Sequence, residues 1–154
     1  MYSTLIALHS LTRWLLLAAL LYCMYRAWAG WLGRKKWMPA DNRWRVITVT
    51  LAHIQAALGV WLYLVSPLIT YFYAYFSQAV HNRQARFFGM EHSLMMLIAV
   101  ILITIASSKA RRRTADDKKF KALAIWLTIA LVVIFINIPW PFSPLTARPW
   151  LRFF

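Results

Sequence analysis

Three histidines and one arginine lie inside long apolar stretches of the chain, where a titratable or charged side chain is costly. His9 and Arg13 are in the first stretch, His53 is in the second and His92 is in the third. Ionisable residues in such surroundings usually face the interior of a helix bundle and mark a functional site. Two imidazoles from facing helices can hold the iron of a b-type haem. These four residues are therefore the candidates for cofactor binding.

The composition places these residues in a membrane. Of the 154 residues, 62% are hydrophobic and only 14% are charged, whereas soluble domains are about half apolar and a quarter charged. The formal net charge is +14, but the cations are concentrated in two short clusters between apolar stretches. That pattern is typical of cytoplasmic loops that contact anionic lipid headgroups. We therefore expect an integral membrane protein with no nucleic-acid partner.

The lengths of the apolar stretches predict a single all-α domain, an integral membrane four-helix bundle. A membrane helix needs about 20 residues, and the expected helices span residues 4–28, 43–66, 86–108 and 120–138. Pro67 disturbs the second helix, and residues 68–76 either continue it past a kink or lie in the membrane interface. Residues 77–86 and 109–121 are polar and predict loops. Residues 139–154 contain four prolines, which predicts a non-helical aromatic tail at the interface.

The distribution of Lys and Arg predicts the orientation. Most of them lie in the first and third connections between helices, whereas the second connection and the tail carry only Arg83, Arg86, Arg148 and Arg152. The side richer in Lys and Arg is cytoplasmic. Both termini are therefore expected outside.

Counting residues from the centre of each predicted helix gives the depth of each histidine. His9 and His92 both fall in the outer half, about 3 Å apart in depth, whereas His53 falls roughly 14 Å from His92 towards the cytoplasm. His9 and His92 could therefore ligate one haem b, with Arg13 at a propionate or in an ion pair. The alternative is two buried histidines that are hydrogen-bonded to Ser, Thr or Glu. His53 could ligate a second haem, contact a quinone headgroup, or pack against a Thr.

Other polar and soft side chains near these histidines leave alternatives open. Glu91 could carry protons between the outer surface and a quinone, or form an ion pair with Arg13 or Arg86; the ion pair is the favoured interpretation. Met90, Met95 and Met96 could bind a soft metal such as Cu(I) or could simply fill gaps in the core.

The segments that carry these residues are TLIALHSLTRW, TLAHIQAALGVWLYLVSP, FFGMEHSLMMLIAVILITI and IPWPFSPLTARP. Together they resemble a family of small four-helix bacterial membrane proteins catalogued as cytochrome-B-like. The resemblance implies haem b, electron transfer and a bacterial inner membrane, with His9, His53 and His92 as candidate ligands. The second and third helices are also distantly similar to one half of haem A synthase. The chain lacks that enzyme's second half, and it has three intramembrane histidines where diheme b cytochromes use four.

The sequence thus predicts a b-type cytochrome-like electron-transfer subunit of a respiratory complex, which exchanges electrons with quinol. It would bind haem b through His9 and His92. Whether it has an enzymatic activity of its own is left open. The alternatives are a cofactor-free accessory or assembly subunit of a larger respiratory membrane complex, and a small metal-handling protein that uses His9, His92 and methionines.

Overall fold

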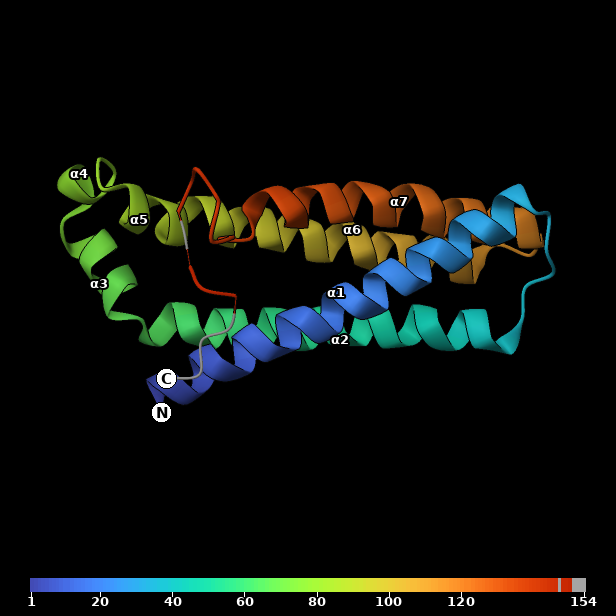
Figure 1. Cartoon of the computed structure of the whole chain (residues 1–154), viewed down its shortest axis with the longest axis horizontal. Coiled ribbons are helices and arrows are strands. Elements are labelled where there is room, and N and C mark those ends of the chain that lie inside the picture. Colours follow the sequence, from blue (N-terminus) through green and yellow to red (C-terminus); the bar gives the residue numbers. More distant parts are fainter. Residues whose placement is uncertain (147, 151–154) are drawn as a thin grey trace.

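The chain folds into four long helices, as a computed structural model of residues 1–146 and 148–150 shows (Figure 1). The helices are α1 (Tyr2–Leu32), α2 (Pro39–Val65), α6 (His92–Arg112) and α7 (Asp116–Asn137). A π-helical turn, η1 (Phe87–Glu91), joins α6 to the short α5 (Arg83–Arg86). Four helical segments are long and apolar enough to cross a membrane, the third running without a break over Arg83–Arg112. The all-α four-helix prediction is therefore confirmed.

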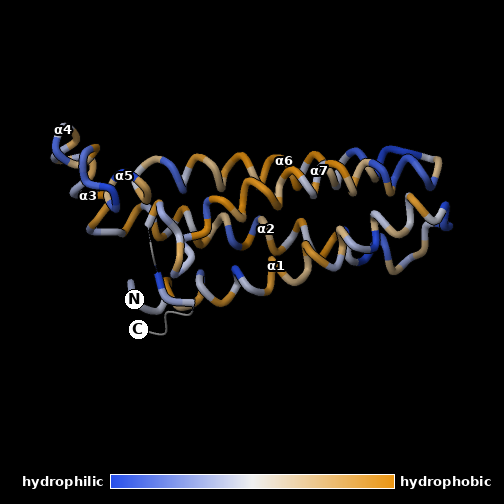
Figure 2. The backbone as a smooth tube through the Cα atoms, turned by 45° about the horizontal axis from the view of Figure 1, so that its top comes forward, coloured by the Kyte–Doolittle hydropathy of each residue, from blue (hydrophilic) through white to orange (hydrophobic). Residues whose placement is uncertain are grey.

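Successive long helices run in opposite directions and form a closed ring of neighbours. The helix α1 packs against α2 and α7, and α6 packs against α7 and α2. In Figure 1, α1 crosses the other three helices obliquely. Hydropathy changes along the long axis of the bundle. Apolar residues lie in the middle, and the end with the connections 33–38 and 113–115 is hydrophilic (Figure 2).

Small side chains let the helices approach closely along much of the core. Five buried alanines lie on α6 and α7, namely Ala99, Ala106, Ala110, Ala124 and Ala130. In membranes such residues allow close packing between helices, because lipid supplies no hydrophobic driving force for their association. The core contains several residues of α1 but only Ala52 from α2. Most of α2 therefore faces outward.

The long helices extend further into the two hydrophilic connections, 33–38 and 113–115, than the sequence predicts. Residues 109–121, predicted as a loop, include the last turn of α6 and the first turn of α7. Lys109, Arg111 and Arg112 lie in that last turn, and Asp116 and Asp117 lie in that first turn. Each set of charges opposes the partial charge of its helix end. The charged residues thus stabilise helix ends, whereas their clustering in the sequence predicts a loop.

The segment after Pro67 is a separate element. Pro67 begins α3 (Pro67–Ala74), which turns away from the axis of α2 and crosses to the start of the third span (Figure 1). Residues 77–86, predicted as a loop, contain most of α4 (Phe76–Ala79) and all of α5. The side chain of Asn82 caps α5 by accepting a hydrogen bond from the backbone N–H of Ala85.

The described residues of the tail, 139–146 and 148–150, are non-helical, as the prolines predict, and they fold back onto the bundle. The indole N–H of Trp14 donates to the main-chain oxygen of Trp150 over 3.1 Å. The ring of Trp14 also lies 6.0 Å from that of Trp140. The tail therefore packs against the N-terminal half of α1 and the C-terminal end of α7. Residues 147 and 151–154 of the predicted tail lie outside the described part of the chain.

Candidate functional site

His92 is held by the end of the neighbouring helix α7. Its Nδ1 lies 2.8 Å from the main-chain oxygen of Asn137. A carbonyl oxygen only accepts, so Nδ1 carries the hydrogen and Nε2 is left as an acceptor or ligand. Histidines that ligate metals are commonly oriented by such a hydrogen bond from the other ring nitrogen. The rings of Phe87 and Phe88 lie 5.5 and 5.8 Å from the imidazole.

The π-helical turn η1 ends at the residue before His92. Such turns insert an extra residue into a helix and occur frequently at functional sites. Gly89 lies within the turn, where a Cβ atom would come 2.5 Å from Cγ of Phe72. A glycine is therefore required for α3 to pack against η1. No sequence pattern predicts the extra residue that η1 inserts just before His92.

His9 is engaged by Gln55 of α2. The amide nitrogen of Gln55 lies 3.1 Å from Nε2 of His9 and 3.0 Å from the main-chain oxygen of the same residue. The hydroxyl of Thr12 donates to the amide oxygen of Gln55. Nε2 of His9 thus accepts a hydrogen bond, and the ring hydrogen is on Nδ1. That Nδ1 is buried and has no hydrogen-bond partner in the described ranges.

The structure brings His9, Arg13 and His92 to the same end of the bundle. His9 lies beside Gly59 of α2, and one turn further along α2 the hydroxyl of Tyr63 donates to the main-chain oxygen of Gly89, three residues before His92. Trp14, the residue after Arg13, contacts Trp140. Trp140 is three residues after Asn137, whose main-chain oxygen binds His92. The predicted pairing of α1 and α6 through two histidines at similar depth is thus compatible with these contacts.

Two arginines flank the histidine pair. Arg13 donates from Nη2 to the main-chain oxygen of Trp150 over 2.6 Å and stacks 5.3 Å from the ring of Trp14. Its Nε is buried without a hydrogen-bond partner in the described part of the chain. Arg148 of the tail lies 5.2 Å from the ring of Phe88, which itself contacts His92. Arg148 was not a sequence-based candidate, because nothing in the sequence shows that the tail folds back.

Glu91 forms an ion pair with Arg86. Nε of Arg86 lies 2.7 Å from Oε1 of Glu91, and both side chains are partly exposed. Of the two partners expected from the sequence, Arg86 is therefore the one observed. Arg13 is instead bonded to the tail, as described above.

His53 lies in another part of the molecule, on the surface of the bundle. Its side chain is exposed, and Nε2 lies 3.1 Å from the hydroxyl oxygen of Thr104 in α6. Thr104 is about three turns beyond His92 in α6, roughly 18 Å along the axis. The structure therefore keeps His53 apart from His92. Packing against a Thr was one of its predicted roles, and a second haem at His53 stays a prediction.

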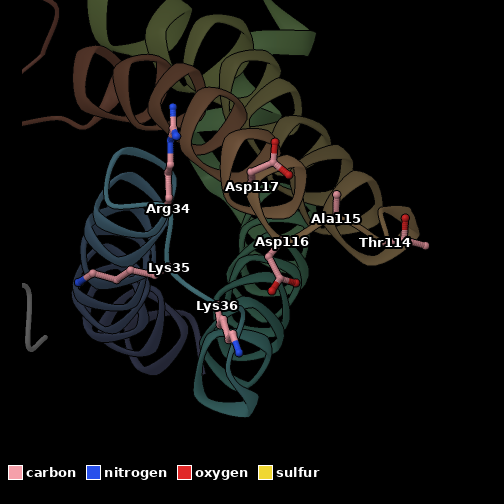
Figure 3. Close-up of a pocket in the computed structure, with 7 residues that line it drawn as sticks. All are labelled: Arg34, Lys35, Lys36, Thr114, Ala115, Asp116 and Asp117. Carbon is pink, nitrogen blue, oxygen red and sulfur yellow. The ribbon is translucent and has the colours of Figure 1, made fainter.

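The opposite end of the bundle holds a pocket of about 650 Å³ between the two hydrophilic connections (Figure 3). Its lining has charges of both signs: Arg34, Lys35, Lys36, Thr114, Ala115, Asp116 and Asp117. Asp116 accepts from the backbone N–H of Trp37 over 3.0 Å and from Lys119 over 3.3 Å. This carboxylate ties the first connection to α7. The pocket contains none of the candidate ligands.

Two polar residues that were not sequence-based candidates contact the histidines of the site. Gln55 and Asn137 were visible as polar residues within apolar helices, which is a weak signal of a buried role. Their partners lie 46 and 45 residues away in the chain, so sequence spacing does not reveal them.

Fold and site together define a multi-pass helical membrane bundle with a histidine on each of two spans at one end. Comparison with known proteins adds no family to that class: no family model, curated protein or solved structure matches the chain. Across residues 1–146 and 148–150, no three or more His, Cys, Asp or Glu side chains group as a metal site would require. Haem iron needs only two protein ligands, so a pair of histidines does not require such a group.

Proposed function

We propose that the chain is a membrane electron-transfer subunit that binds haem b through His9 and His92. The observation that carries the proposal is the hydrogen bond from Nδ1 of His92 to the carbonyl of Asn137. It fixes the imidazole and leaves Nε2 available, at the same end of the bundle as His9. Two imidazoles on separate helices of an apolar bundle are a recurrent ligand set for haem iron.

The surrounding side chains fit such a group. Arg13 and Arg148 are cations at the same end, suited to the two propionate carboxylates. The buried, unpartnered Nε of Arg13 is a polar atom that a propionate would satisfy. Ligation through Nε2 of His9 requires that Gln55 release this atom. When bound, the haem supplies one-electron transfer.

In this proposal the chain exchanges electrons with quinol and passes them to a partner in a respiratory complex of a bacterial inner membrane. The connections between its long helices at the hydrophilic end are only 33–38 and 113–115, which leaves no room there for a separate soluble domain. The residues of this chain bind and orient the cofactor: His92 through Asn137, and His9 from α1. The two arginines balance the charge of the propionates.

A reduced-minus-oxidised spectrum of the purified protein tests the proposal. We expect the sharp α-band of protohaem with two imidazole ligands. His9→Ala and His92→Ala should each lower it at least tenfold per mole of protein. The matched control is His81→Ala, because His81 is exposed and its Nδ1 donates to the main-chain oxygen of Ser77, four residues earlier. Wild-type protein without the band, or a band that survives both substitutions, contradicts the proposal.

One observation favours a second candidate, a cofactor-free accessory subunit. Most of α2 faces outward, and exposed residues on it include Ile54, Val60, Trp61 and Leu64. A partner helix could pack there as well as lipid does. This alternative predicts that the chain forms a stoichiometric membrane complex and never shows the haem band. The complex should form normally with His9→Ala or His92→Ala.

A further inference from the structure

His53 is a polar side chain exposed on the membrane-facing surface of the bundle. It lies within the α2 span, eight residues after Arg45, or about 12 Å deeper along the helix. Its hydrogen-bond partner Thr104 lies within the apolar part of α6, before the cationic last turn. A polar group exposed at this depth is costly unless something covers it, because acyl chains offer no hydrogen bonds.

The hydrogen-bond geometry determines which ring nitrogen of His53 is left without a hydrogen. The hydroxyl of Thr104 donates to the main-chain oxygen of Val100 over 2.7 Å. Having one hydrogen, this hydroxyl can only accept from the imidazole. Nε2 of His53 therefore carries the hydrogen that bonds Thr104, and Nδ1 is left as a bare acceptor. An exposed acceptor inside the bilayer requires a donor that partitions into the bilayer.

We propose that His53 and Thr104 form the headgroup site of a membrane quinol, whose phenolic hydroxyl donates a hydrogen bond to Nδ1 of His53. A hydroquinone ring on an isoprenoid tail carries such a donor at this depth, and phospholipid acyl chains do not. The exposed Ile101 and Leu97 of α6 and Ile54 of α2 supply apolar surface beside the imidazole for the ring and tail. The inference extends the proposed function by locating the site of its electron donor.

A second copy of the chain is a weaker occupant for the same surface. In a two-fold dimer across α2, His53 would face its own copy, and both rings would present an acceptor nitrogen. One ring would have to change tautomer and lose its bond to Thr104. The quinol hydroxyl needs no such change, so the geometry favours it.

Photolabelling tests the site without requiring haem. The protein is reconstituted in nanodiscs and labelled with a reduced azido-substituted quinol, and the labelled peptides are mapped. We expect label on segments 50–57 and 97–104, and at least a tenfold loss of labelling in His53→Leu. That variant should still fold, because it removes a polar group from a lipid-facing position. Thr104→Val, which frees the imidazole from its orienting bond, should lower labelling about threefold to tenfold. His81→Ala should label like the wild type.

The outcomes separate this inference from the haem proposal. Labelling that depends on His53, in protein that shows no haem band, supports the quinol site and contradicts the haem proposal. A haem band in protein whose labelling is unchanged by His53→Leu contradicts the quinol site alone. Loss of a dimer in His53→Leu, measured by light scattering, would assign this surface to a second copy and overturn the proposal.

Discussion

The imidazole of His92 is bonded to the main-chain oxygen of Asn137 over 2.8 Å, so the first residue of α6 is tied to the last residue of α7. Carbonyls in the last turn of a helix have no partner within that helix. In a membrane such a group needs another donor. One histidine thus satisfies the end of α7 and is itself oriented by it, which couples the stability of this end of the bundle to the direction of Nε2.

This relationship predicts a loss of stability when the histidine is replaced. In protein prepared without haem, His92→Leu should lower the free energy of unfolding by about 1–3 kcal/mol, because it leaves a buried carbonyl without its donor. The measurement is equilibrium unfolding in mixed micelles. His53→Leu is the control and should cost less, about 0.6 kcal/mol, because His53 is exposed and the Thr104 hydroxyl keeps its bond to Val100. Equal stability of the two variants would show that the bond to Asn137 contributes nothing.

The interaction between Gln55 and His9 predicts an effect on haem affinity. Gln55→Ala removes the amide that occupies Nε2 of His9. If ligation requires breaking this bond, its loss should tighten haem binding about threefold to tenfold, corresponding to about 0.5–1.5 kcal/mol. Titration of haem into the protein, followed by absorbance, measures the change. Gln84→Ala on the exposed surface of α5 is the control. Weaker binding by Gln55→Ala would show that Gln55 positions His9 for ligation.

Arg34 predicts a stabilising substitution at the hydrophilic end. It has a φ of 47°, the left-handed conformation. The N–H groups of Arg34 and Lys35 bond the carbonyls of Trp31 and Gly30 over 3.3 and 3.0 Å, as in the helix end where glycine is usual. Arg34→Gly and Arg34→Asn should therefore each raise the free energy of unfolding by up to about 1 kcal/mol. Arg34→Ala removes the same charge without relieving the backbone, and it should not stabilise.

Sequence reasoning could predict the four spans, because an apolar stretch of sufficient length has few other structures open to it. It placed the end of α6 too early and the start of α7 too late, because charged residues such as Lys109 and Asp116 are typical of loops. The partners of His9 and His92 could not be predicted, since each lies on a helix far away in sequence. The prolines of the tail forbid a helix, but they do not specify that Trp150 returns to Arg13. The turn η1 has no residue signature at all.

Gly89 gives the last prediction. A Cβ atom at this position would lie 2.5 Å from Cγ and 2.7 Å from Cδ1 of Phe72, and Phe72 is buried on α3. Gly89→Ala should therefore lower the free energy of unfolding by about 1–3 kcal/mol through overpacking. Gly59→Ala is a milder comparison, since its Cβ would lie 3.3 Å from Cε1 of His9.

The clash with Phe72 can be isolated with a double-mutant cycle. Phe72→Leu alone should destabilise the protein, because it leaves unfilled space against η1. Combined with Gly89→Ala, the new methyl group occupies part of that space, so the double variant should lose less stability than the sum of the two single losses, by about 0.5 kcal/mol or more. Unfolding in mixed micelles measures all three variants. Strict additivity would mean that Gly89 is not required by Phe72, and that the extra residue of η1 has a cause other than the packing of α3.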